Sequence, residues 1–249
     1  MRAAFGWLTV LRVGGNPSPR GVLPWAPLVG LVLGDLASLT GWLGARYASP
    51  LVGAVLGVAL LAWLTRGLHL DGLADTADGL GPLRGRERAL QVMRAGDVGP
   101  FGVATLVLTL LLQVAALAQL FTVEGGWLAL WTAVVAARLA MARTGLPGVP
   151  VAEGSSLGAA VAGTVSRVWL AGCTVVAVAC VLATATWLGD VAQGARLVAA
   201  GVLGLAAGEL LHRRARARLG GVNGDVMGAA GEVTTAATLL AAAVLLPLG

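Results

Sequence analysis

The stretch GPFGVATLVLTLLLQVAALAQLF, residues 99–121, carries no charged side chain from end to end. A helix needs about 20 mainly apolar residues to cross the hydrocarbon core of a bilayer. The stretch therefore predicts a transmembrane helix.

The rest of the chain has the same character. It has 249 residues, of which 57% are hydrophobic and 12% charged, and its mean hydropathy is +0.86. Soluble domains carry about a quarter charged residues. We therefore expect one integral membrane domain over residues 1–249, an all-α polytopic membrane helix bundle of about seven transmembrane helices. The predicted spans are 24–45, 50–67, 99–121, 126–145, 167–188, 195–212 and 226–247.

The arginines sort to one side of these spans. All 17 basic residues are arginine, and only Arg46 and Arg196 fall on the other side. The positive-inside rule then predicts a cytoplasmic N-terminus and an external C-terminus. The opening segment, residues 1–15, is typical of an amphipathic helix on the membrane surface and shows no signal-peptide cleavage site. The arginines on the predicted cytoplasmic side are Arg2, Arg12, Arg20, Arg66, Arg84, Arg86, Arg88, Arg94, Arg138, Arg143, Arg167, Arg213, Arg214, Arg216 and Arg218.

The segment HLDGLADTADGL, residues 69–80, concentrates acids in this apolar chain. On a helix, Asp71, Asp75 and Asp78 stand at i, i+4 and i+7 and share one face. Three such anions repel one another unless a divalent cation neutralises them, and oxygen-only ligands favour Mg²⁺ or Mn²⁺ over zinc. His69 lies off that face, so we expect a local hydrogen bond or a substrate contact from it. The alternative is a solvated loop whose acids face water.

A second segment, GRERALQVMRAGDVGPFG, covers residues 85–102. Its arginines surround apolar residues, as in a helix at the headgroup level, so Arg84, Arg86 and Arg88 can equally serve anionic lipid. Arg94 precedes glycines and Pro100, which end the helix and let backbone N–H groups approach an anion. We therefore expect Arg94 to contact a phosphate.

A third segment, LGGVNGDVMGAAGEV, covers residues 219–233. Asp225 and Glu232 are seven apart and share a helical face, and an acid inside a membrane helix is a functional-site hypothesis by default. The alternative for Glu232 is a packing role beside Arg138, which is also intramembrane. Asp35 and Glu209 are expected to be structural acids.

Together these segments resemble the cobalamin synthase family, the adenosylcobinamide-GDP ribazoletransferases. The likeness rests on HLDGLADTADGL, the Arg-Glu-Arg segment, the MRxxxxGPFG element and GGVNGDVMGAAGE, and it extends to FGWLTVLRVGGNPSP and RLAMARTGLPG. The resemblance implies a late step of vitamin B12 synthesis at the inner face of a bacterial cell membrane. There, α-ribazole or its 5′-phosphate is joined to adenosylcobinamide-GDP with release of GMP, in a Mg²⁺-dependent phosphotransferase reaction.

The resemblance also implies roles for individual residues. Metal ligands are expected at Asp71, Asp75, Asp78 and Asp225, and catalytic carboxylates at Asp78, Asp225 and Glu232. Substrate contacts are expected at His69, Arg94, Asn223 and Arg143, with Asn223 standing where threonine is common in the family. The choice of general base between Asp78 and Asp225 stays open.

Two rival functions are weighed against this one. The Asp-Gly pair at 71–72 also begins the motif of CDP-alcohol phosphotransferases, but the spacing of the later acids differs. A cation-coupled transporter would use Asp35, Glu209 and Glu232 near the midplane, whereas most acids here lie at one membrane face. We expect membrane lipid as a partner and no nucleic acid, and the sequence leaves a homo-oligomer open.

Overall fold

The computed structural model describes residues 1–11, 18–81 and 84–247. Within those ranges the chain is helical and has no β-strand, apart from one isolated parallel bridge between Val151 and Val222. The predicted all-α fold class is confirmed, although Arg12, counted above among the cytoplasmic arginines, lies outside the described residues. The elements are α1 (Arg2–Leu8), η1 (Pro19–Gly21, a 3₁₀ turn), α2 (Val22–Tyr47), α3 (Pro50–Leu64), α4 (Leu68–Leu80), α5 (Arg86–Met93), α6 (Pro100–Leu120), α7 (Trp127–Arg143), α8 (Ser156–Val161), α9 (Arg167–Trp187), α10 (Val191–Leu219) and α11 (Gly224–Leu245).

The structure does not confirm the count of seven spans. Five helical segments within the described residues are long and apolar enough to cross a membrane, namely η1 with α2, and then α6, α9, α10 and α11. The pair α3 and α4 qualifies as a sixth only if it is taken as one span bent by 88°. Helix α7 has 17 residues, fewer than the roughly 20 of a typical span. The chain is a multi-pass membrane protein with five or six candidate spans.

The break between α3 and α4 lies inside the predicted span 50–67. Arg66 and Gly67 both adopt left-handed backbone conformations, with φ of 56° and 67°. Since an α-helix cannot continue through that region, the chain turns sharply there. The turn rests on α1: the Arg66 guanidinium Nη2 donates to the Trp7 carbonyl at 3.0 Å, and the Val10 amide donates to the Leu64 carbonyl at 2.7 Å. Helix α1 therefore supports the point from which α4 departs.

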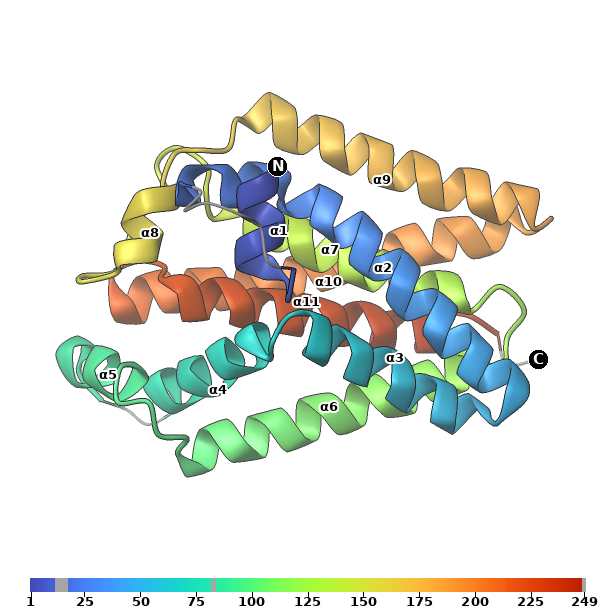
Figure 1. Ribbon diagram of the computed structural model, residues 1–249, viewed down its shortest axis with the longest axis horizontal. Helices are drawn as coiled ribbons and strands as arrows, with labels where there is room; N and C mark the ends of the chain where they lie inside the picture. The colour runs from blue at the N-terminus through green and yellow to red at the C-terminus, as the bar shows by residue number, and fades with distance from the viewer. Residues whose placement is uncertain (12–17, 82–83, 248–249) are drawn as a thin grey trace.

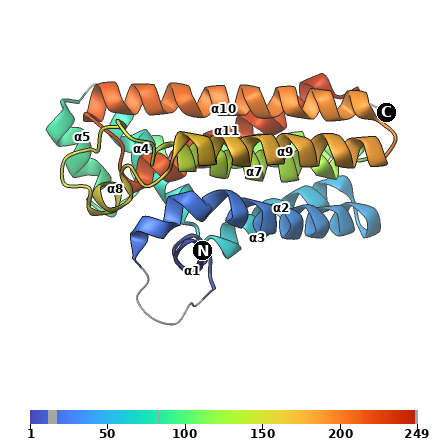
Figure 2. The same cartoon turned by 90° about the horizontal axis from the view of Figure 1, so that it is seen from above.

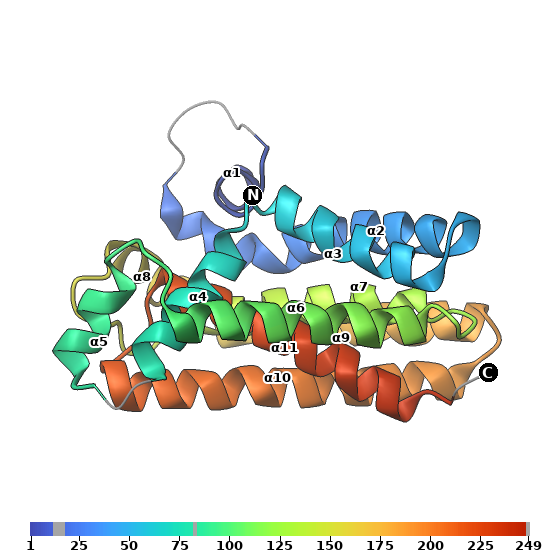
Figure 3. The ribbon, with the colours of Figure 1, turned by 90° about the horizontal axis from the view of Figure 1, so that it is seen from below.

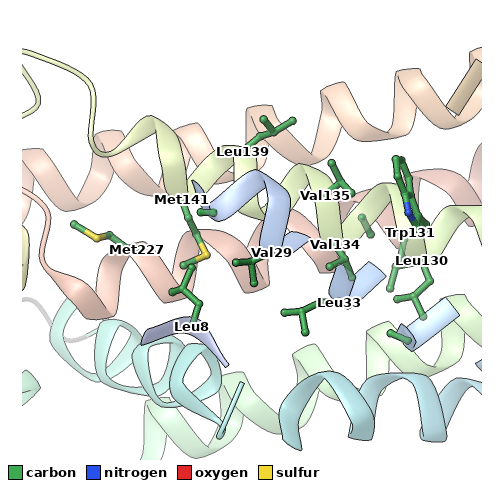
Figure 4. Close-up of a cluster of buried hydrophobic side chains, with 14 of the residues drawn as sticks. Leu8, Val29, Leu33, Leu130, Trp131, Val134, Val135, Leu139, Met141 and Met227 are labelled. Carbon is green, nitrogen blue, oxygen red and sulfur yellow. The ribbon is translucent and has the colours of Figure 1, made fainter. Parts of the chain in front are cut away.

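The long helices run side by side along the longest axis of the molecule (Figure 1). Turned views show three layers, with α2 and α3 on one side, α6, α7 and α9 in the middle, and α10 and α11 on the other side (Figures 2 and 3). Every residue of α7 from Leu128 to Ala142 is buried, so α7 is the central helix. Val29 and Leu33 of α2 belong to the same buried cluster as Leu130 and Val134 of α7 (Figure 4).

The short helices α4, α5 and α8 gather at the end of the bundle where α10 ends and α11 begins (Figure 1). The predicted arginine sorting matches this arrangement, because the arginine-rich connections lie at this end while Arg46 and Arg196 lie toward the opposite ends of their helices. Helix α10 ends at Gly220 in a left-handed cap with φ of 81°. Asn223 starts α11 three residues later, and the Val151–Val222 bridge ties this short connection to the loop after α7.

Candidate active site

Helices α4 and α11 cross where glycines replace side chains. A Cβ atom on Gly72 would lie 2.9 Å from the Asp225 Cα, and one on Gly228 would lie 3.1 Å from the His69 Cα. Small residues at a crossing let two membrane helices approach at backbone distance. The crossing therefore brings Asp225 of α11 next to the acidic face of α4.

This approach creates a cluster of carboxylates, Asp71, Asp75 and Asp225, which we call the carboxylate cluster. Asp75 is partly buried and is repelled by other carboxylates, most strongly Asp225 and then Asp71. Within the described residues every ion pair is made by Glu209, so no arginine compensates the cluster. Asp71 is exposed to solvent. The cluster is a site of concentrated, uncompensated negative charge at the rim of the bundle.

Asp78 differs from its neighbours on α4. Its side chain is buried, with 4% of the residue exposed, and its two oxygens accept backbone N–H groups of Gly99 at 2.8 Å and Gly102 at 3.0 Å. These amides begin α6, so Asp78 neutralises the positive end of that helix. The glycine turn after Arg94 does present N–H groups to an anion, as its sequence indicates, and here the anion is the Asp78 carboxylate. The structure favours a positioning role for Asp78, which fastens α4 to α6.

Asn223 holds Asp225 in place. Its side-chain oxygen accepts the Val226 amide at 2.9 Å, which caps α11, and its side-chain nitrogen donates to Asp225 Oδ2 at 2.9 Å. One asparagine thus starts the helix and orients the carboxylate in the first turn. The predicted substrate contact from Asn223 is not tested by this geometry.

Two predicted substrate-binding arginines have protein partners. The guanidinium of Arg94 donates to the backbone carbonyl of Glu153 and so joins the end of α5 to the loop before α8. Arg143 Nη1 pairs with Glu209 Oε2 of α10 at 2.6 Å, outside the carboxylate cluster. Arg94 is solvent-exposed and keeps donors to spare for a ligand.

His69 and Glu232 lie deeper. His69 is 1% exposed, and neither ring nitrogen has a hydrogen-bond partner among the described residues. Gln113 Nε2 donates to Glu232 Oε2 at 2.9 Å, and both residues line a cavity of about 20 Å³ with Arg138. Glu232 and Arg138 form no ion pair in the described chain, and the cavity between them is large enough for about one water molecule. Burial keeps His69 from a substrate in this conformation.

The sequence interpretation missed a cavity beside Asp78. It has a volume of about 280 Å³, and its lining includes Arg84, Arg88, Gln91 and Asp97. Arg84 also donates to the Asp78 carbonyl at 3.4 Å. The available signal was spacing, since Arg84 and Arg88 are four apart beside the glycine segment that docks on Asp78. The cavity presents two guanidinium groups to any phosphate that enters it.

The donor atoms of the cluster suit a hard divalent cation. Carboxylate oxygens are the usual protein ligands of Mg²⁺, which also keeps several waters. Within the described residues, however, no three His, Cys, Asp or Glu side chains converge closely enough to form a ready-made metal site. Loading of Mg²⁺ would require rotation of side chains such as the exposed Asp71.

Comparison with known proteins identifies the family. A family model described as cobalamin-5-phosphate synthase matches residues 1–243. The chain belongs to this family. Among family relatives, proteins named adenosylcobinamide-GDP ribazoletransferase share 41% identity in Frankia casuarinae, 35% in Corynebacterium efficiens and 35% in Bradyrhizobium diazoefficiens. The three alignments cover 99%, 97% and 98% of this chain, and 95%, 90% and 92% of the relatives. No solved structure matches the chain.

Membership of the cobalamin-5-phosphate synthase family confirms the resemblance found in the sequence. The match extends over nearly the entire chain, so it includes the acidic face of α4, the start of α6 and the start of α11. The two rival functions, a CDP-alcohol phosphotransferase and a cation-coupled transporter, receive no support from these relatives.

Proposed function

We propose that the chain is an adenosylcobinamide-GDP ribazoletransferase, which joins α-ribazole, or its 5′-phosphate, to adenosylcobinamide-GDP in late cobalamin synthesis. The observation that carries this proposal is the family match over residues 1–243. In the reaction, a ribose hydroxyl oxygen bonds to the phosphorus that remains with the corrinoid. The bond from that phosphorus to the GMP oxygen breaks, and GMP leaves.

Asp71 and Asp75 are the residues that would hold Mg²⁺, with Asp225 beside them. Their support is electrostatic, because three carboxylates meet at the α4–α11 crossing without an arginine partner among the described residues. When bound, a divalent ion at this position supplies charge neutralisation for the pyrophosphate of the substrate. The protein itself contributes the crossing that keeps the acids together.

Asp225 is the stronger candidate for general base. One of its oxygens accepts from Asn223, and the other has no hydrogen-bond partner among the described residues. Asp78, by contrast, is 4% exposed, and each of its oxygens accepts a backbone N–H of α6. A base must lie within reach of the proton that it removes. Asp225 is therefore assigned the hydroxyl proton of the incoming ribose.

The arginines beside Asp78 suit the nucleotide. Arg84 and Arg88 line the cavity of about 280 Å³ next to the glycine turn, and Arg94 lies exposed after α5. Guanidinium groups bind phosphate oxygens through paired N–H donors and stabilise charge that develops on a leaving phosphate. We assign Arg84 and Arg88 to the GDP portion of the substrate, with Arg94 as a further contact.

The same end of the bundle is proposed to face the cytoplasm of a bacterial cell with the protein in the inner membrane. Support comes from the arginine-rich connections, which lie at the end that carries the carboxylate cluster (Figure 1). Positively charged loops remain on the cytoplasmic side during insertion.

The test is GMP release by the purified protein in liposomes. We expect release from adenosylcobinamide-GDP only when both α-ribazole and Mg²⁺ are present. Asp75→Asn should reduce the rate about a hundredfold or more, because it removes one anionic ligand from the site that would hold Mg²⁺. Glu124→Gln, which changes an exposed acid in the connection after α6, is the matched control and should leave the rate unchanged. Release of GMP without α-ribazole, or a normal rate in Asp75→Asn, would contradict the proposal.

The structure also weighs against the transporter alternative. The three acids that a transporter would use have separate protein partners in this structure. Asp35 accepts from Trp131 at 2.8 Å, and Glu209 pairs with arginines. Glu232 accepts from Gln113. Acids that relay a transported ion are expected to line a shared, hydrated path near the midplane. No second function is proposed.

A further inference from the structure

A crevice runs between α9 and α10, with α7 as its floor. Two cavities make it up, one of about 310 Å³ and one of about 60 Å³. Leu139 of α7, Thr174 of α9 and Leu205 of α10 line both cavities, so the two join end to end. Helices α9 and α10 lie beside each other along this line (Figure 2). We call this feature the α9–α10 crevice.

The inner part of the crevice is apolar. Its lining includes Trp131 and Val135 of α7, Val181 of α9 and Val198 of α10. Helix α9 closes this part with Ala177 and Val181, whereas most of its other residues face outward, since only 11% of its most apolar 18-residue stretch is buried. The inner part therefore admits only a few methylene groups of a hydrocarbon chain that comes from the bilayer beside α9.

The outer part of the crevice is lined by Arg143, Glu209 and His212, and Arg213 and Arg216 add positive charge beside it through their contacts with Glu209. Glu209 is contacted by three arginines: Arg143 at 2.6 Å, Arg213 at 2.9 Å and Arg216 at 3.3 Å. The single negative charge of Glu209 balances one of the three guanidinium charges, so this set of four side chains carries a net charge of about +2. His212 lines the same wall as a buried imidazole: it is 2% exposed, and neither ring nitrogen has a hydrogen-bond partner among the described residues.

We propose that the α9–α10 crevice binds one anionic phospholipid of the surrounding membrane. The phosphate lies against Arg143, with His212 beneath it and Arg213 and Arg216 beside the opening, and a few methylene groups of one acyl chain enter the apolar part toward Trp131. Basic pockets between transmembrane helices at a membrane surface recognise anionic lipid headgroups in this way. The apolar continuation favours a lipid over a free phosphate. Arg143 is thereby assigned to lipid instead of substrate.

This site is separate from the proposed catalytic site. None of the residues that line the crevice belongs to the carboxylate cluster or to the cavity beside Asp78. Lipid binding can therefore be measured without the enzymatic reaction, and its failure would leave the ribazoletransferase proposal untouched.

The test compares phosphatidylglycerol binding by the full chain and its variants in detergent, read by native mass spectrometry and by thermal stabilisation. Arg143→Gln combined with Arg216→Gln should weaken phosphatidylglycerol binding about tenfold or more, because two headgroup contacts are lost while Arg213 still pairs with Glu209. Arg214→Gln is the matched control, since it removes an exposed arginine from the same helix outside the crevice. It should bind the lipid normally.

A steric pair of variants tests the crevice itself. Ala206→Phe places a ring in the cavity next to Glu209 and should also weaken binding, whereas Val175→Phe adds the same ring on the exposed face of α9 and should not. Three results would overturn the proposal: equal binding of zwitterionic phosphatidylcholine, equal loss in Arg214→Gln, or displacement of phosphatidylglycerol by millimolar inorganic phosphate. The last would show a free-phosphate site.

Discussion

At the scale of single residues, identical side chains on one helix face perform different tasks. Asp71, Asp75 and Asp78 share the acidic face of α4, yet Asp71 is exposed and Asp78 is buried with both oxygens bonded to the start of α6. Helical phase predicts that the three acids share a face, and α4 confirms the helix. It cannot reveal the bonding of Asp78, because Gly99 and Gly102 reach it only through the tertiary fold.

Asp78→Asn should therefore act through stability. The amide keeps one acceptor but turns an NH₂ group toward the other backbone N–H, and a buried unsatisfied donor costs about 1–3 kcal/mol. We expect a lower melting temperature, measured by nanoDSF in detergent, with a matching fall in activity. Asp71→Asn should lower Mg²⁺-dependent activity and leave the melting temperature unchanged. A stable but inactive Asp78→Asn would restore Asp78 as a base candidate.

Asn223 offers a second contrast among variants. Asn223→Thr keeps an oxygen for the Val226 amide and a hydroxyl proton for Asp225, so activity should be largely retained. Asn223→Asp keeps the cap but repels Asp225, so activity should fall at near-normal stability. Asn223→Ala loses the cap as well, at about 1 kcal/mol. Rates of GMP release and melting temperatures of the three proteins would check this order of activity and stability. Equal activity in all three would exclude the proposal that Asn223 orients Asp225.

At the scale of elements, the sequence predicts the positions of the helices better than the contacts between them. The runs of apolar residues locate α2, α6, α9 and α11 within two residues of the predicted spans, whereas α10 extends to Leu219, seven residues beyond the predicted end at 212. The α4–α11 crossing could not be foreseen, since Gly72 and Gly228 are two among 37 glycines. What distinguishes them is the backbone of the facing helix, which is a property of the folded chain.

Gly72→Ala should separate the two helices that carry the cluster. The new Cβ would lie 2.7 Å from the Asp225 carbonyl oxygen, and overpacking of this kind typically costs about 1–3 kcal/mol. We expect lower Mg²⁺ affinity, seen as a higher Mg²⁺ concentration at half-maximal activity. Gly172→Ala on α9 is the control, because its Cβ would have no neighbour within 4 Å. Equal behaviour of the two variants would argue against the crossing as the source of the site.

At the scale of the whole molecule, the sequence predicts an all-α membrane bundle with the arginine-rich connections at one end, and the structure bears this out. The count of seven spans fails to be confirmed for two local reasons. A hydropathy profile does not reveal the left-handed turn at Arg66 and Gly67. It also does not distinguish a short buried helix such as α7 from a span that faces lipid.

The predicted orientation can be tested with single cysteines in a background where Cys173 and Cys180 are replaced by serine. Cysteine at Gln91, an exposed residue of α5, should react with a membrane-impermeant maleimide only in inverted vesicles. Cysteine at Tyr47, 80% exposed at the far end of α2, should react in intact spheroplasts. The opposite pattern would place the carboxylate cluster outside the cell.

The support of the α3–α4 turn by α1 has a practical consequence for solubilised protein. The sequence predicts that α1 lies on the membrane surface, and such a helix owes its position to the boundary between headgroups and acyl chains, which a detergent micelle changes. If α1 lifts, the hydrogen bonds from Arg66 to Trp7 and from Val10 to Leu64 are lost, and the departure angle of α4 is free to relax. The activity of the solubilised protein would then depend on the choice of detergent, because the bilayer holds α1, and through it α4, in position.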